Sequence, residues 1–183
     1  MIIRIFLILI SVTIFSCSEN NNSENLTSNN KSFVWKENLT VGDIPDDSVK
    51  GFLNGKEIKF EYVNFEKWRG SGDNVLNFST KRPLQDCGFI ENDDAFSVMI
   101  KNGDFNPGEN SKISFSNNQD NFISYFHYYV EGKDILKVES PWSGIVIIDS
   151  LEDKKVKGKI AIVYNDDAKS WIAGKFEAIR CNN

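Results

Sequence analysis

Histidine and cysteine, which most catalytic and metal sites require, are scarce in this sequence. One histidine, His127, and three cysteines occur among 183 residues. A multi-histidine metal site or a zinc protease centre needs more imidazole than one residue provides. His127 lies between Phe126 and Tyr128 in a stretch with strand character, which favours a structural role. The sequence therefore nominates no catalytic residue, and enzymatic activity stays open with a leaning against it.

The sequence contains no hydrophobic run long enough to cross a membrane as a helix. The N-terminal run Ile5–Phe15 holds about ten apolar residues, whereas a spanning helix needs about 20. Arg4 precedes this run, and the small residue Ser16 stands at its exit. A basic residue, a short apolar core and a small exit residue are typical of a secretory signal. We assign residues 1–16 to a signal peptide.

The end of this stretch, Ile14-Phe15-Ser16-Cys17, resembles the bacterial lipobox. The resemblance implies a lipoprotein, with a diacylglyceryl thioether on Cys17, cleavage before it and N-acylation by a fatty acid such as palmitate. An ordinary signal peptide with a chance cysteine and an uncut N-terminal anchor are the alternatives. Ser18 stands where the enteric-type rule places aspartate for inner-membrane retention. By that resemblance, we expect the outer membrane of a bacterial envelope, on its periplasmic or surface face.

Asparagine and serine dominate the segment after the cysteine. Ser18–Ser32 contains six Asn and four Ser, and such a composition cannot bury enough apolar surface to fold. Phe33–Asp47 is transitional, because its apolar residues are scattered and Pro45 interrupts regular structure. We expect residues 17–45 to form a lipidated, disordered or transitional tether, followed by one domain over residues 46–183.

Basic residues are outnumbered in the chain. Lys and Arg total 21 against 26 Asp and Glu, which gives a net charge of −5 and a pI near 5.0. An acidic balance argues against nucleic acid as a partner and against anionic lipid as the main one. The expected partners are the membrane, through the lipid anchor, and either a glycan or another envelope protein.

The domain itself lacks helical periodicity. Apolar residues recur with period two in Ile58–Tyr62, Gly158–Tyr164 and Trp171–Ile179, which is typical of half-buried strands. Gly144–Ile148 is apolar at every position except its glycine and predicts a central strand. About nine or ten such strands predict an all-β domain, an antiparallel β-sandwich of Ig-like or jelly-roll-like type. A small β-barrel is the alternative.

Assigning Cys17 to lipid leaves Cys87 and Cys181. In an oxidising compartment two remaining cysteines favour a disulfide, here one that ties the C-terminal strand to the middle of the chain. Two unpaired thiols are the alternative.

Aromatic and acidic residues provide two candidate binding sites. The first is a sugar-stacking platform, for which packing within the sheet is the alternative; its residues are Trp68, Trp142 and Trp171. The second is a calcium loop, since calcium takes six to eight oxygen ligands; its residues are Asp104, Asn106 and Asn110. Pro107 also suits a plain turn, and no other cofactor is expected.

The turn and strand residues of the domain resemble small, uncharacterised lipoproteins of Bacteroidota with an all-β domain. The resemblance rests on Ser143-Gly144, Ile148-Asp149, Lys155-Val156-Lys157-Gly158, Gly174-Lys175-Phe176, Asn106-Pro107-Gly108 and the closing Cys181. It implies a β-sandwich on the cell envelope and brings no active site. We expect a lipid-anchored protein with a non-catalytic binding or interaction domain. A carboxylate-based glycan-acting enzyme and a purely structural lipoprotein are the alternatives.

Overall fold

The computed structural model describes residues 32–68, 70–88, 90, 95–100, 105–108, 110–114, 122–129 and 132–181. Within these ranges the chain is all-β, as predicted, and its single helical element is the 3-10 turn η1 (Val41–Asp43). The strands are β1 (Lys50–Leu53), β2 (Lys56–Lys59), β3 (Tyr62–Lys67), β4 (Asn74–Ser79), β5 (Ala95–Ile100), β6 (Asn110–Ser114), β7 (Phe122–Tyr129), β8 (Leu136–Glu139), β9 (Pro141–Leu151), β10 (Lys155–Tyr164) and β11 (Trp171–Arg180).

In this described part of the chain, no helix has the length and apolar character needed to cross a bilayer.

All strands belong to one sheet with the order β6-β9-β10-β11-β3-β4-β5-β7-β8, and β1 and β2 join it beside β11. The long antiparallel meander β9–β10–β11 is the C-terminal part that the sequence pattern predicted. The described strand order starts at β6 and ends at β8, so the sheet is open. Only the pairing of β11 with β3 is parallel among the named strands, which departs from the fully antiparallel expectation.

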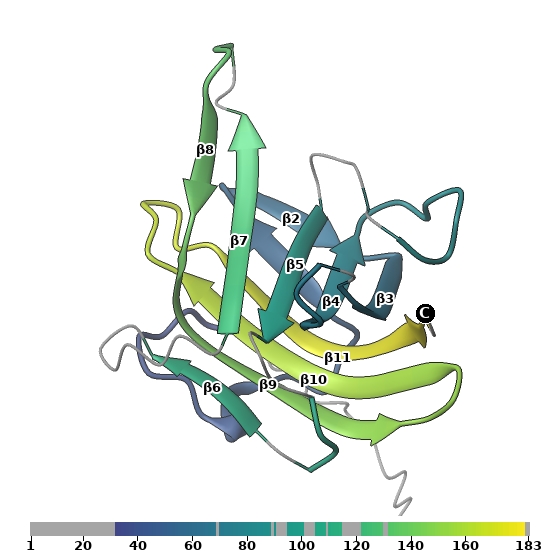
Figure 1. Ribbon diagram of the computed structural model, residues 1–183. Helices are drawn as coiled ribbons and strands as arrows, with labels where there is room; N and C mark the ends of the chain where they lie inside the picture. The colour runs from purple at the N-terminus through teal and green to yellow at the C-terminus, as the bar shows by residue number, and fades with distance from the viewer. Residues whose placement is uncertain are drawn as a thin grey trace, which may run out of the picture.

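The sheet bends where β11 changes neighbours. The first residues of β11 pair with β1, whereas its end pairs with β3 through Ile179↔Asn64 and Arg180↔Phe65. Figure 1 shows the consequence: β9, β10 and β11 run across the lower part of the molecule, and β4, β5 and β7 stand above and across them. The two parts form two layers of a sandwich-like fold, a lower layer (β6, β9–β11) and an upper layer (β3–β5, β7, β8).

The main core fills the space between the two layers. Phe78 of β4 stacks on Phe96 of β5 at a centroid distance of 4.5 Å and meets Phe176 of β11 edge-on at 5.6 Å. Val156, Ile160 and Ile162 supply the facing side of β10, because alternate residues of a strand point to the same side. Each of these side chains contributes about 1.5–3 kcal/mol by burial.

A second cluster lies on the opposite side of the lower layer, which we call the outer face. Ile145 and Ile147 of β9 point to it, whereas Val146 and Ile148 point into the main core. This explains why the sequence of β9 is apolar on both sides. The outer face is covered by the segment before β1, which buries Phe33, Leu39 and Ile44. Phe33, Leu39 and Ile44 therefore pack onto the domain although they precede residue 46, where the sequence placed the start of the domain.

Candidate functional site

Three tryptophans gather at one end of the outer face. Trp35 comes from the covering segment, Trp142 from the start of β9 and Trp171 from the start of β11, and all three pack, partly buried, against the second cluster. The strand register brings the last two together, because Val163 of β10 pairs with both Ser143 and Trp171. We call Trp35, Trp142 and Trp171 the tryptophan patch.

Specific contacts hold two rings of the tryptophan patch in place. The Trp35 Nε1–H donates a hydrogen bond of 2.9 Å to the carbonyl oxygen of Tyr164. The Lys169 ammonium lies 4.1 Å from the centroid of the Trp35 ring, within the range of a cation–π interaction. The Trp171 ring lies 4.9 Å from the ring of Phe33. These contacts fix the orientation of the Trp35 and Trp171 rings.

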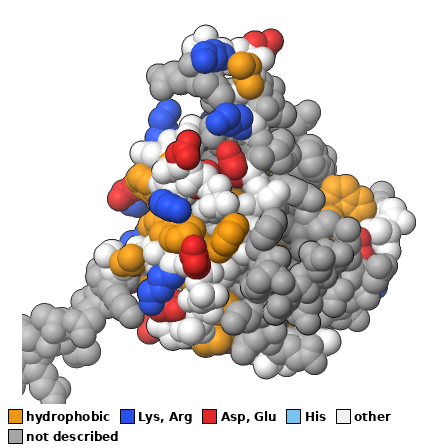
Figure 2. Space-filling view, turned by 90° about the vertical axis from the view of Figure 1, so that its left-hand side faces the viewer, with side chains coloured by type: hydrophobic (Ala, Val, Ile, Leu, Met, Phe, Trp, Pro, Cys, Tyr) orange, Lys and Arg blue, Asp and Glu red, His pale blue; other side chains and the backbone are white. Residues whose placement is uncertain are grey.

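Two aliphatic side chains of the covering segment are exposed. Val34 is 64% exposed and Val41 is 47% exposed, although both belong to the segment that otherwise covers apolar surface. Figure 2 views the side on which this segment and the β10–β11 turn lie in Figure 1, and it shows apolar side chains gathered among lysines and acids. Isolated exposed apolar residues are ordinary, but Val34 stands directly before Trp35 in the chain.

The covering segment is closed by an ion pair. Lys36 Nζ contacts the carboxylate of Asp43, which also accepts hydrogen bonds of 2.9 Å from the Thr40 N–H and 2.8 Å from the Thr40 Oγ1. The hydrogen bond from Lys36, followed by those from Thr40, lowers the pKa of Asp43 from 3.8 to about 2. The carboxylate is therefore charged across the physiological range and keeps the turn around η1 closed.

Lysines continue the outer face beyond the tryptophan patch. They lie on the same side of the sheet as Ala161 and Ala173 of the second cluster, by alternation along the strands. Asp46 bridges Lys159 and Lys175, and the hydrogen bond from Lys175 lowers its pKa. The whole set of these ion pairs joins Lys50 to Asp47, Lys155 and Lys157 to Glu177, and Lys159 and Lys175 to Asp46.

The three tryptophans suggested by the sequence do not form one platform. Trp142 and Trp171 do lie together, and Trp35 joins them. Trp68, which is 45% exposed, follows β3 instead and closes a turn in which its N–H donates to Asp73 and its carbonyl accepts from Gly72. Because β3 runs parallel to the end of β11 and Phe65 pairs with Arg180, Trp68 lies beyond the strand end opposite Trp171, roughly 40 Å along the strand direction.

The residues of the expected calcium loop are only partly within the described chain. Asp104 and the side chain of Asn110 fall outside it, and Asn106 is exposed. The turn between them buries Phe105 against Phe65, and the Gly108 N–H donates to the Ile148 carbonyl at 2.9 Å. Where residues are described, no group of three His, Cys, Asp or Glu is placed to hold a metal ion. Calcium binding at this loop stays a prediction.

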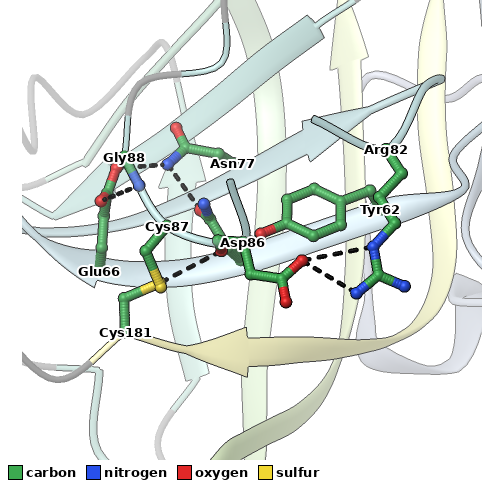
Figure 3. Close-up of a disulfide and its surroundings, with 9 residues drawn as sticks. Tyr62, Glu66, Asn77, Arg82, Asp86, Cys87, Gly88 and Cys181 are labelled. Carbon is green, nitrogen blue, oxygen red and sulfur yellow. Dashed lines mark hydrogen bonds and ion pairs between the residues drawn. A yellow bond between two sulfur atoms is a disulfide. The ribbon is translucent and has the colours of Figure 1, made fainter. Parts of the chain in front are cut away.

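Cys87 and Cys181 form the predicted disulfide, with a Cα–Cα distance of 5.7 Å (Figure 3). The bond ties the loop after β4 to the end of β11. Next to it, the Cys181 N–H donates to the Phe65 carbonyl at 2.8 Å, and the Gly88 N–H donates to Glu66 at 3.2 Å. Cys17 and the Asn- and Ser-rich stretch up to residue 31 lie outside the described residues, as does the side chain of His127.

A buried polar network lies under the disulfide loop (Figure 3). Asn77 Nδ2 donates to Asn64 at 2.8 Å and to Glu66 at 2.9 Å, and Ser97 Oγ donates to Asn77 at 2.6 Å. The Tyr62 hydroxyl donates to the Asp86 carbonyl, and burial raises the pKa of this phenol above 10. Because these contacts join the sheet to the loop, the network holds the loop in place.

Sequence reasoning missed Trp35 and the covering segment. Two features of the sequence indicate the covering segment. Four apolar residues interrupt a polar stretch, namely Phe33, Trp35, Leu39 and Ile44. A strand that is apolar on both sides also needs another part of the chain packed against each side. Comparison of the chain with protein-family models, curated proteins and solved structures finds no match. Function must therefore be argued from the chemistry of the chain.

Proposed function

We propose that this protein is a lipid-anchored bacterial envelope protein whose all-β domain is a non-catalytic binding module. The pairing of two of the three cysteines is the observation that supports the lipid anchor. Cys87 and Cys181 are bonded to each other, which leaves Cys17 as the third cysteine, directly after the signal sequence. A disulfide also fits an oxidising compartment outside the cytoplasm.

The tryptophan patch is the binding surface of this proposal. Contacts within the domain hold the rings of Trp35 and Trp171, and rings held in this way lose less entropy on binding. The two acids near it with shifted pKa values, Asp43 and Asp46, both have lowered values because of their lysine partners. A general acid of a glycan hydrolase needs a raised pKa, and neither of these two carboxylates has one.

Metabolic labelling with radioactive palmitate tests the anchor. The full precursor and its Cys17→Ala variant are expressed in a bacterium with lipoprotein processing. We expect the label and the detergent phase to retain only the wild-type chain. Equal labelling of the two chains would contradict the lipoprotein proposal, and a Cys87→Ala variant is the matched control that keeps its label.

Incubation with peptidoglycan and polysaccharide fragments tests the absence of catalysis. Mass spectrometry of the fragments should find every mass unchanged after prolonged incubation with the purified chain. New product masses that depend on the protein would replace the binding module with the glycan-acting enzyme.

A further inference from the structure

Resting on the proposed lipid anchor, we infer that the outer face, from the tryptophan patch to its lysines, docks on the phospholipid headgroup layer of the membrane that carries the anchor. The partner of the binding surface is then a bilayer that contains anionic lipid. The domain then lies against the membrane in one orientation, with its lower layer next to the bilayer and its upper layer facing away from the bilayer.

The segment that would carry the lipid anchor joins the domain at the outer face. The described chain starts at Ser32, and Phe33 and Trp35 already lie on the outer face. Ser32 follows Cys17 by fifteen positions. Such a length spans about 50 Å at full extension and roughly 20 Å as a flexible coil. An acylated Cys17 therefore keeps the outer face at a high effective concentration next to the bilayer.

The chemistry of the tryptophan patch suits a membrane interface. Indole rings favour the boundary between headgroups and acyl chains, because an apolar body and a polar N–H are both satisfied there. Val34, the neighbour of Trp35 in the chain, and Val41 of the same covering segment also expose aliphatic surface. An aqueous ligand gains little from exposed valines, whereas the apolar edge of a bilayer removes them from water.

The lysines of the outer face favour contact with anionic headgroups. Five lysines on the outer face share three carboxylates in their ion pairs. These five lysines and their three carboxylate partners carry a net charge of +2, although the chain as a whole has a net charge of −5. Anionic headgroups act over about a Debye length, so the charge near the contact decides the attraction. The net charge, which argued against anionic lipid, averages over the rest of the molecule.

A glycan is the rival occupant of the tryptophan patch. Sugar stacking needs a free ring face, but the Lys169 ammonium already lies 4.1 Å from the centre of the Trp35 ring. A sugar would have to displace this ammonium. A phosphate headgroup can instead pair with it while the ring stays in place, so the contacts favour lipid.

Tryptophan quenching by brominated lipid tests the docking. The acylated full-length mature chain is reconstituted into vesicles of phosphatidylethanolamine and phosphatidylglycerol, with or without bromine on the acyl chains. We expect bromine to reduce wild-type emission, and the reduction to weaken at high salt or without phosphatidylglycerol. The double variant Val34→Glu/Lys157→Glu should lose the reduction. Both positions are exposed, and equal urea midpoints of the two chains establish that the variant is folded.

Two matched variants serve as controls. Lys133→Glu changes an exposed lysine in the turn before β8, and Trp68→Phe removes the tryptophan that lies away from the patch. Both should be quenched like the wild type. Loss of quenching in Trp68→Phe, or equal quenching of wild type and the double variant, would overturn the assignment of the outer face.

The failures of the two proposals are distinguishable. A chain that carries acyl groups and sediments with vesicles but shows no quenching overturns docking and leaves the anchor intact. A chain without acyl groups that stays in the supernatant overturns the anchor. Protection of the patch by a soluble glycan, without quenching by lipid, would replace the membrane with a sugar.

Discussion

Trp35 donates its indole N–H to the carbonyl oxygen of Tyr164, which lies 129 residues away in the sequence. This hydrogen bond fastens the segment before the first strand to the end of β10. It makes that segment a part of the folded domain, and it holds the tryptophan patch close to Ser32, where the described chain starts.

Replacement of Trp35 should weaken this attachment. Trp35→Phe keeps a ring but loses the N–H, so we expect the free energy of unfolding to fall by about 1 kcal/mol. Trp35→Ala also loses the packing against the second cluster and should lower it by about 3 kcal/mol. Urea unfolding measures both, with Trp68→Phe as the exposed control. Identical midpoints for Trp35→Ala and wild type would show that the segment does not stabilise the domain.

Gly158 should not tolerate a side chain. A Cβ there would lie 2.2 Å from the Ile147 carbonyl oxygen and 2.7 Å from the ring of Phe176, its cross-strand partner. We expect Gly158→Ala to lower the free energy of unfolding by about 3 kcal/mol, because the strand or the core must shift. Thermal unfolding by circular dichroism measures the loss. Gly42→Ala is the control, since its Cβ would meet only Thr40 Oγ1 at 3.9 Å, and a larger loss at Gly42 would contradict the packing argument.

Removal of the disulfide should loosen the junction of the two layers. Cys87 and Cys181 are 94 residues apart, and a cross-link of that length stabilises by about 4 kcal/mol in the chain-entropy model. We expect a reductant to lower the urea midpoint of the wild type accordingly. A Cys87→Ser/Cys181→Ser variant should match the reduced wild type and ignore the reductant. A midpoint that reductant does not change, with both thiols shown to be free, would refute this role.

Asp43 should make stability depend on pH in the acid range. Its pKa is about 2 in the folded chain and 3.8 in the unfolded chain, so the charged form is favoured by folding. The stabilisation is complete above pH 4 and is lost as the pH falls towards 2. The midpoint difference between wild type and Asp43→Asn should therefore be largest at pH 5–6 and vanish near pH 2. A difference that persists at pH 2 would mean that Asn disrupts the turn for another reason; Asp167→Asn is the exposed control.

The strand pattern of the C-terminal part was readable from the sequence because each strand is long and one-sided. Val156, Ile160 and Ile162 recur with a period of two, and this periodicity alone requires a face turned to a core. The cysteine count likewise predicted the Cys87–Cys181 bond, since redox chemistry limits what two remaining cysteines do.

Only the tertiary structure decided which surfaces these strands share. Local periodicity says which side of a strand is apolar, but not what covers it, so Trp35 could not be matched with Trp142 and Trp171, or Trp68 separated from them. The distribution of charge over the surface likewise depends on the tertiary structure. The composition reports a net charge of −5, whereas the strand register collects Lys155, Lys157 and Lys159 on one face. Contacts between residues far apart in the chain depend on pairing and bending of the whole sheet, and local patterns do not encode either.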